Sequence, residues 1–272
     1  MSDRADASFA AVTHVAAATA WDAALASGGA LAIEDDAYHH LFRARRLAQG
    51  DSLRVVDGRG AARWATIVSI DRRRAVAQLG DAAPTGESAY ALHLAVAPLR
   101  PERASWLVEK ATELGVAGVH FVATARTPRQ LRPASLARLT RVADAAVAQS
   151  HRARRPSLTG VWSWREAPDA LADRLAADGA ASPDDADALM LDVPDAASPA
   201  DAVRPDVPLF TGSVGIAWIG PEGGWTDDER AALRARGARP LALGASVLRV
   251  ETAALAVAAL ALRAAGPAAV GA

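Results

Sequence analysis

The spacing of apolar residues divides the chain into two parts with different periods. From residue 31 to 80, apolar and polar residues alternate in short segments, SLRVVDG (52–58) and RWATIVSI (63–70), with glycine-containing or polar turns between them. A period of two that is broken by turn residues is typical of the strands of a small β-barrel or sheet. The stretch DAAPTGESA (81–89) breaks this pattern and indicates a linker. We therefore expect one domain over residues 1–86 and a second over residues 87–272.

The second part alternates strand-like and helix-like segments. After the apolar run ALHLAVAP (91–98), apolar residues recur with a period of 3.6 from Pro101, which suits a first helical turn, to Gly115, which suits a helix stop. Further predicted elements are strands at 119–124, 188–193 and 214–220, a helix from about 135 to 149, a helix with a loose end in 172–187 and a surface loop in 194–212. Strands that alternate with helices predict an α/β domain with a largely parallel sheet.

Two glycine loops follow predicted strands near the C-terminus. In IGPEGGWTDDE (219–229), Thr226 and Glu229 form a capping box that predicts a helix from Asp227 to Gly237. In LALGASVLRVETAALAVAALAL (241–262), a short strand and a glycine loop precede a helix so apolar that we expect it to be buried on nearly all sides, in the core or at a subunit interface. Ligands of open parallel sheets bind beyond the carboxyl ends of the strands. The two loops are therefore expected to form one pocket, although glycines that only supply positive φ would also explain them.

Composition and charge limit the possible functions. Hydrophobic residues make up 51% of the 272, which is enough for a sizeable core, and the absence of cysteine excludes disulfides and thiolate chemistry. No apolar run is long enough to cross a bilayer and the N-terminus does not resemble a leader, so a cytoplasmic location is expected. A net charge of −1 argues against bulk electrostatic binding of nucleic acid, but arginines cluster at 43–46, 72–74, 126–132 and 152–155 and leave local basic patches possible.

Both glycine loops, together with HHLFRARRLAQGDSLRVVDGRG (39–60) and EKATELGV (109–116), resemble the RsmE family of 16S ribosomal RNA uracil-N3 methyltransferases. The resemblance covers nearly the whole chain, with the segments in the family's order. It implies an N-terminal PUA-like β-barrel that helps to hold RNA and a C-terminal SPOUT domain with a deep trefoil knot over about 189–262. It also implies S-adenosylmethionine as cofactor, a homodimer with the active site near its interface, no metal, and 3-methyluridine in the 16S rRNA of the 30S subunit as product.

The resemblance assigns residues by position. Implied cofactor contacts are Ile219, Gly220, Pro221, Gly223, Gly224, Leu243, Gly244, Val247, Leu248 and Thr252. Candidate RNA contacts are Arg43, Arg46, Arg100, Arg103, Arg126, Gln149, Arg152 and Arg154. For any single arginine a solvated surface charge is the alternative. Ala148 stands where the family has a glutamate, which removes any role for that carboxylate, and Trp225 takes the place of an aromatic residue expected to pack against the cofactor loop.

Methylation at uracil N3 limits the catalytic candidates. N3 carries a proton whose pKa is well above neutral, so the reaction must remove that proton and stabilise charge on O2 or O4. Arg249 is the first candidate because a guanidinium stays protonated and directs two donors toward oxygen, and an ion pair that holds the loop is the alternative role. Glu222 could accept a proton or contact the cofactor, or it could anchor the turn, and Glu251 could act on the substrate or only complement the helix dipole.

Other functions fit parts of the sequence. A methyltransferase acting on another RNA, such as transfer RNA, would share the cofactor loops, and only the 39–60 segment favours the ribosomal substrate. A non-catalytic RNA-binding assembly module predicts damaged cofactor loops, whereas 220–224 and 248–252 match the family. A small-molecule nucleotide-binding enzyme would explain the glycine loops but not the preceding domain with its arginines.

Overall fold

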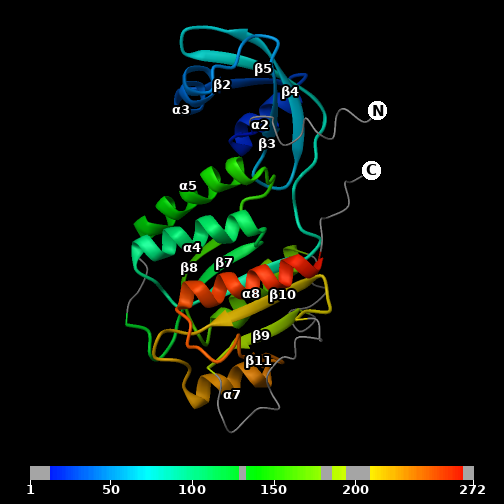
Figure 1. Cartoon of the computed structure of the whole chain (residues 1–272). Helices are drawn as coiled ribbons and strands as arrows, with labels where there is room; N and C mark the ends of the chain where they lie inside the picture. The colour runs from blue at the N-terminus through cyan, green and yellow to red at the C-terminus, as the bar shows by residue number, and fades with distance from the viewer. Residues whose placement is uncertain (1–12, 129–132, 179–185, 194–208, 266–272) are drawn as a thin grey trace. The chain divides into compact units, whose positions relative to one another are not determined.

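A computed structural model of the chain describes residues 13–128, 133–178, 186–193 and 209–265 (Figure 1). These residues fall into two compact units. Of the described residues, the first unit contains 13–87 and 144–155, and the second contains those of 88–143 and 156–265. Among the described helices, none combines the length and the apolar composition that a membrane span requires.

The first unit is built on a five-stranded sheet with the order β1-β3-β4-β5-β2. Its neighbours pair antiparallel, except that β1 runs parallel to β3. The strands are β1 (Thr13–Val15), β2 (Ala30–Glu34), β3 (Ser52–Val56), β4 (Ala62–Ile70) and β5 (Arg74–Ala82). The helices are α2 (Ala18–Ala26), α3 (Asp35–Tyr38) and the π-helical turn η1 (His39–Ala44).

The period of two places one face of this sheet in a core. In β5, Ala75, Ala77 and Leu79 are buried and alternate with more exposed residues. They pack with Trp21 of α2 in one apolar cluster. The expected alternating strands are thus present, whereas the sequence did not predict α2 or β1. The described strand order ends at β1 and β2, and closure of the sheet into a barrel stays a prediction.

The second unit confirms the predicted α/β class, because every described strand pair in its sheet is parallel. The order of the six strands is β11-β9-β10-β6-β7-β8. They are β6 (Ala91–Val96), β7 (Gly118–Ala123), β8 (Ser157–Ser163), β9 (Asp187–Leu191), β10 (Val214–Ile219) and β11 (Arg239–Leu241). The sequence pattern predicts a strand near each of these except β8, whose segment is SLTGVWS.

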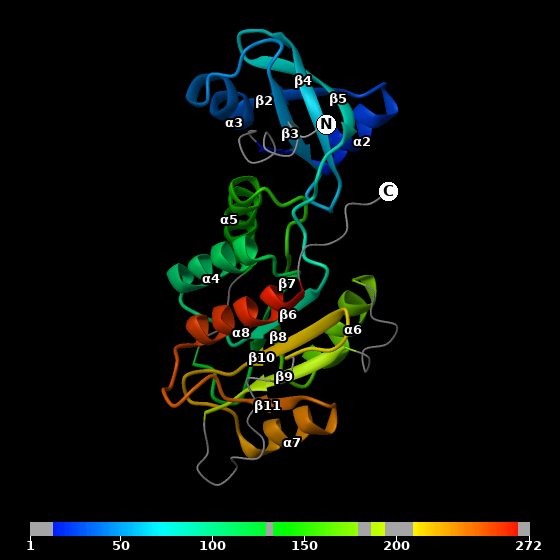
Figure 2. The same cartoon turned by 45° about the vertical axis from the view of Figure 1, so that its right-hand side comes forward.

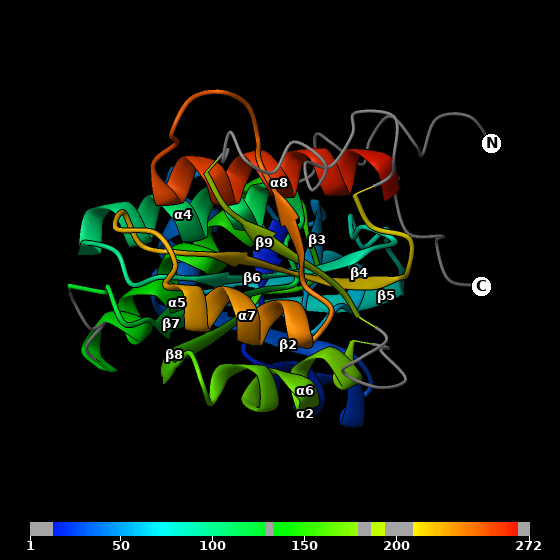
Figure 3. The same ribbon diagram turned by 90° about the horizontal axis from the view of Figure 1, so that it is seen from below.

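Helices cover both faces of this sheet (Figure 3). They are α4 (Pro101–Leu114), α5 (Pro133–Ser150), α6 (Ala167–Ala177), α7 (Asp227–Ala235) and α8 (Val250–Ala265). The helices α4 and α8 lie side by side in Figures 1 and 2 and share one apolar cluster with β6 and β10. The other face packs against α6 and α7 in a second cluster that includes Leu171, Trp218 and Leu233.

The ends of α4 are where the sequence placed them. Pro101 begins the helix, and Gly115 ends it in the left-handed region with a φ of 99°. The core of a single chain does not bury α8 on nearly all sides, and burial at a subunit interface, the other predicted possibility, stays a prediction. In α8, Ala254, Val257 and Ala258 are buried, but Thr252, Ala259 and Leu260 are exposed, so the helix buries one side against the sheet and α4 and leaves an apolar strip in solvent.

Candidate functional site

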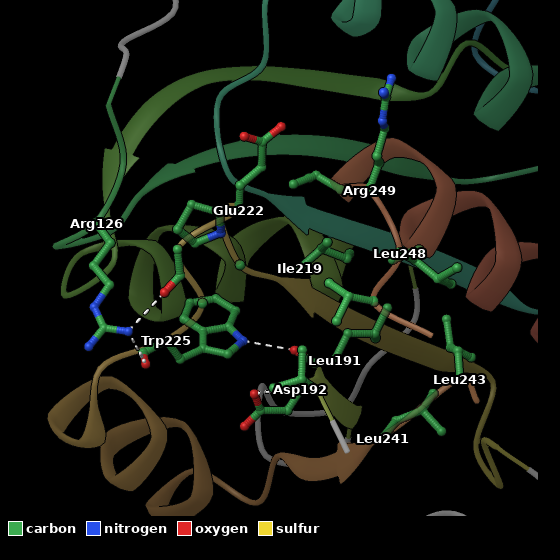
Figure 4. Close-up of a pocket in the computed structure, with 18 of the residues that line it drawn as sticks. Arg126, Leu191, Asp192, Ile219, Glu222, Trp225, Leu241, Leu243, Leu248 and Arg249 are labelled. Carbon is green, nitrogen blue, oxygen red and sulfur yellow. Dashed lines mark hydrogen bonds between the residues drawn. The ribbon is translucent and has the colours of Figure 1, made fainter. Parts of the chain in front are cut away.

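A cavity of about 540 Å³ lies beyond the carboxyl ends of β9, β10 and β11 (Figure 4). The predicted residues that line it are Arg126, Ile219, Gly220, Pro221, Glu222, Gly223, Gly224, Leu243, Gly244, Val247, Leu248 and Arg249. Both glycine loops therefore meet at one pocket, as the order of strands and turns predicted. The further lining residues are Leu191, Asp192, Val193, Trp225, Arg230, Leu241, Ser246, Val250 and Ala253.

Trp225 organises the first glycine loop. Its ring is buried, and its Nε1 donates a hydrogen bond of 2.9 Å to the backbone oxygen of Leu191 at the end of β9. A Cβ atom on Gly220 would lie 2.9 Å from this ring, closer than Cβ atoms normally approach other heavy atoms. Gly224 needs glycine for another reason, since its φ is 70°. The tryptophan thus packs against the loop backbone, as expected, and Gly220 allows that contact.

The segment after β7, which contains Ala125 and Arg126, makes further hydrogen bonds to the first glycine loop and the start of α7. The Nη1 of Arg126 donates to the backbone oxygens of Gly223 at 2.8 Å and Trp225 at 3.3 Å. Glu229 is fully buried, and its two carboxylate oxygens accept from the backbone N–H groups of Ala125 at 2.7 Å and Thr226 at 2.8 Å. The predicted capping box of α7 is confirmed, and Glu229 also ties that helix start to the neighbouring loop. Arg126, a candidate RNA contact, holds the loop in this structure.

An ion pair between Arg230 of α7 and Asp192 forms part of the pocket wall. Arg230 approaches both oxygens of Asp192, with Nε at 2.6 Å from Oδ2 and Nη2 at 3.1 Å from Oδ1. The hydrogen bond to Asp192 raises the pKa of the Arg230 guanidinium above its ordinary value. Neither residue is among the site residues that the sequence predicts. The available signal was the position of Asp192, a carboxylate directly after a buried strand end.

The cavity combines an apolar floor with a polar edge. Leu191, Ile219 and Leu241 end β9, β10 and β11, Leu243 follows two residues after β11, and the glycine loops contribute backbone polar groups. A volume of this size suits a ligand of a few hundred daltons, and an apolar lining with a few backbone polar groups is typical of small-molecule sites. Among the described residues no group of three or more acidic or histidine side chains has a geometry suited to a metal ion.

Two of the three predicted catalytic residues, Glu222 and Arg249, line this pocket. Glu222 and Arg249 point away from Leu241 and Leu243 in Figure 4. The Oε1 of Glu222 is 3.3 Å from Nη1 of Arg103, and the Oε1 of Glu251 is 3.5 Å from Nε of the same arginine. Glu251 and Thr252 stand on the first turn of α8 and do not line the cavity, and Thr252 is exposed.

The remaining candidate RNA contacts differ in accessibility. Arg100 in the second unit and Arg43, Arg46 and Gln149 in the first are exposed. Arg152 is only 2% exposed, and its Nη2 lies 2.7 Å from Oε2 of Glu87 within the first unit. Glu87 also accepts a hydrogen bond from the backbone N–H of Arg154 at 2.8 Å. The Arg152 side chain is thus a buried structural element here, and its burial argues against the expected role in binding RNA.

Comparisons with known families and proteins agree with this geometry. A family model described as an RNA methyltransferase domain matches residues 86–262, and one described as an RNA methyltransferase PUA domain matches residues 33–80. The Synechocystis protein named ribosomal RNA small subunit methyltransferase E is 28% identical over 218 residues, which cover 79% of this chain and 67% of that protein.

Three solved structures have similar folds. A probable rRNA methyltransferase from Porphyromonas gingivalis is 28% identical with a TM-score of 0.68, covering 86% of this chain and 92% of its own. The ribosomal RNA small subunit methyltransferase E from Neisseria gonorrhoeae, solved with bound S-adenosyl methionine, is 26% identical with a TM-score of 0.69 and coverage of 85% and 90%. A putative methyltransferase from Legionella pneumophila in complex with SAM is 26% identical with a TM-score of 0.68 and coverage of 87% and 93%.

Proposed function

The chain belongs to the RNA methyltransferase family, whose domain model spans residues 86–262, and from this premise we propose that it methylates N3 of a uridine in 16S rRNA with S-adenosylmethionine as methyl donor. The observation that carries the proposal is the cavity that two glycine loops form at the carboxyl ends of the parallel strands. Two relatives of similar fold are solved with this cofactor.

The lining of the cavity fits the cofactor. Apolar side chains at the strand ends would hold the adenine ring, and backbone polar groups of 220–224 and 243–244 would meet its polar groups. When bound, S-adenosylmethionine supplies an electrophilic methyl group on a sulfonium centre. The hydrogen bond and burial of Trp225 hold the first loop against the end of β9, where it lines the cavity.

The RNA side of the proposal rests on the first unit and the pocket edge. The match to a PUA domain over residues 33–80 includes the exposed Arg43 and Arg46, which would contact phosphates without reading sequence. The target base would have to leave its stack to reach the pocket. At the edge, Arg249 would stabilise charge on a uracil oxygen, and Glu222 would accept the N3 proton or orient the base.

Further parts of the proposal concern architecture. A homodimer is supported by apolar side chains that α4 and α8 leave in solvent, Trp106 at 46% and Leu260 at 51% exposure. Such a strip at the face of two packed helices suits contact with a second copy. The trefoil knot and the closed barrel, which the family resemblance implies, belong to the same proposal. So does a domain boundary after residue 86, which the linker-like stretch 81–89 predicts.

The test is methyl transfer from labelled S-adenosylmethionine to three substrates in parallel: small ribosomal subunits lacking the modification, naked 16S rRNA, and transfer RNA. Transfer to small-subunit RNA is the expected result. Transfer to transfer RNA alone would replace the substrate assignment. Cofactor binding without transfer to any of the three would favour a non-catalytic binding protein.

A further inference from the structure

Three charged side chains form a bridge at the edge of the pocket, which we call the rim bridge: Glu222, Arg103 and Glu251. Glu222 belongs to the first glycine loop, Arg103 to the first turn of α4, and Glu251 to the first turn of α8. Arg103 contacts both acids, with Nη1 at 3.3 Å from Glu222 and Nε at 3.5 Å from Glu251. One guanidinium therefore links three elements that are far apart in the sequence.

The two ends of the bridge lie in different environments. The side chain of Glu222 is 78% exposed, so its ion pair with Arg103 is screened by water and easily exchanged. The side chain of Glu251 is 8% exposed, and its Oε2 is buried with no hydrogen-bond partner among the described residues. A buried carboxylate retains a nearby cation strongly because water cannot replace it. Glu251 thus holds Arg103 in place, while Glu222 occupies the side that a substrate could take.

Arg249, the arginine that the sequence favours for catalysis, differs from Arg103 in its exposure and contacts. It is exposed, and its guanidinium makes no hydrogen bond or ion pair with the described residues. Arg103 is two-thirds buried, with a side-chain exposure of 32%, and forms an ion pair with the buried Glu251. Electrostatic stabilisation of a transition state requires a charge that is already fixed before the reaction. Of these two arginines, Arg103 meets that requirement.

We propose that Arg103 is a further catalytic residue of the methyl transfer and that Glu251 is its positioning residue. This inference rests on the proposed function. When the target uracil enters, one of its carbonyl oxygens replaces Glu222 at Nη1 of Arg103. The guanidinium then stabilises the negative charge that O2 or O4 gains as N3 loses its proton.

The step balances with the groups already named. N3 gives its proton to Glu222 or to water and uses the freed electron pair to form a bond to the methyl carbon. The bond between that carbon and sulfur breaks, and its electron pair stays on sulfur, which becomes a neutral thioether. Arg103 keeps its protons throughout, because a guanidinium does not act as an acid near neutral pH.

The experiment compares wild-type full-length protein with Arg103→Gln, Arg103→Lys, Glu251→Gln and the double variant Arg103→Gln/Glu251→Gln. Arg236→Gln is the matched control, because Arg236 forms a surface ion pair with Asp169 at 2.9 Å and lies outside the cavity. For each protein we would measure S-adenosylmethionine affinity by calorimetry, kcat and KM for small ribosomal subunits, and kcat as a function of pH.

We expect Arg103→Gln to lower kcat by roughly 10²- to 10³-fold, as for removal of one donor to a developing anion, with cofactor affinity changed less than about threefold. Arg103→Lys should retain more activity than Arg103→Gln, because lysine keeps the positive charge although it lacks the two parallel N–H donors of a guanidinium. The deficit of Arg103→Gln should shrink as pH rises, because alkaline solution ionises N3 without help. A merely structural role would give a deficit independent of pH.

Glu251→Gln should lower kcat less than Arg103→Gln, and the double variant should be no worse than Arg103→Gln, because the two residues act as one unit. If the wild type is active and Arg103→Gln has full activity, the inference is overturned and the proposed function stays intact. The same holds if the kcat of Arg103→Gln is reduced by the same factor at every pH. A wild type that transfers no methyl group would overturn both.

Discussion

At the scale of single residues, the fully buried carboxylate of Glu229 has two fixed donors, the N–H groups of Ala125 and Thr226. In Glu229→Gln one oxygen becomes an NH2 group that faces an N–H donor, which leaves that donor unsatisfied. We expect the free energy of unfolding to fall by about 1–3 kcal/mol. Chemical denaturation measures this, with the exposed Glu102→Gln in α4 as control. If Glu229→Gln and Glu102→Gln were equally stable, the proposed role of Glu229 as acceptor of two backbone hydrogen bonds would be contradicted.

Gly220 is a second residue with a defined steric role. An alanine Cβ there would meet the buried Trp225 ring at 2.9 Å, so Gly220→Ala must displace the ring or the loop. We expect a loss of about 1–3 kcal/mol in stability, as for overpacking, and at least tenfold weaker binding of S-adenosylmethionine. The control is Gly160→Ala in β8, whose Cβ would make an ordinary contact of 3.5 Å with Leu136. Unchanged cofactor affinity in Gly220→Ala would show that the loop tolerates a displaced tryptophan.

At the scale of elements, a buried polar chain joins three strands and α6 inside the second unit. His93 on β6 and His120 on β7 share a ring-nitrogen contact of 2.9 Å, and His120 also contacts Thr159 on β8 at 3.0 Å. Nε2 of His93 lies 2.9 Å from the buried carboxylate of Asp178, directly after α6. Burial, followed by the charges of His93 and Arg174, lowers the pKa of His120 well below 6.5, although Asp178 opposes the shift.

This depressed pKa predicts a pH dependence of stability. Below the ordinary value of 6.5 the unfolded chain binds a proton at His120 and the folded chain does not, so stability falls as pH falls from 6.5 toward 5. His120→Gln should make this slope shallower by up to about 1.4 kcal/mol per pH unit. Urea unfolding across this range measures the slope, with the exposed His39→Gln as control. The same slope in wild type and His120→Gln would contradict the prediction.

Elements set by local signals were predictable from the sequence. The capping box at Thr226 and Glu229 and the proline and glycine at the ends of α4 depend only on neighbouring residues, and the structure has them where expected. The strand β8 was missed because SLTGVWS carries a glycine and no regular alternation, and it is defined by pairing with β7. The contacts of Arg126 with 223–225 and of Trp225 with Leu191 were not predictable, because they join segments that only the tertiary fold brings together.

At the scale of the whole molecule, the apolar strip on α4 and α8 predicts self-association. Leu260→Glu would place a charge in the proposed contact between two copies, where desolvating it costs several kcal/mol. We expect the wild type to be a dimer and Leu260→Glu a monomer by light scattering after gel filtration. The control is Leu25→Glu, which adds the same charge at an exposed leucine of the first unit. A monomeric wild type would contradict the proposal of a homodimer.

The central claim is that the cavity at the strand ends serves methylation of N3 of a uridine in small-subunit rRNA. The most direct test treats small ribosomal subunits from cells that lack this modification with the protein and S-adenosylmethionine, digests the RNA, and identifies methylated nucleosides by mass spectrometry. We predict that 3-methyluridine appears with the wild type and is strongly reduced with Gly220→Ala. A different methylated nucleoside, or none despite cofactor binding, would contradict the account.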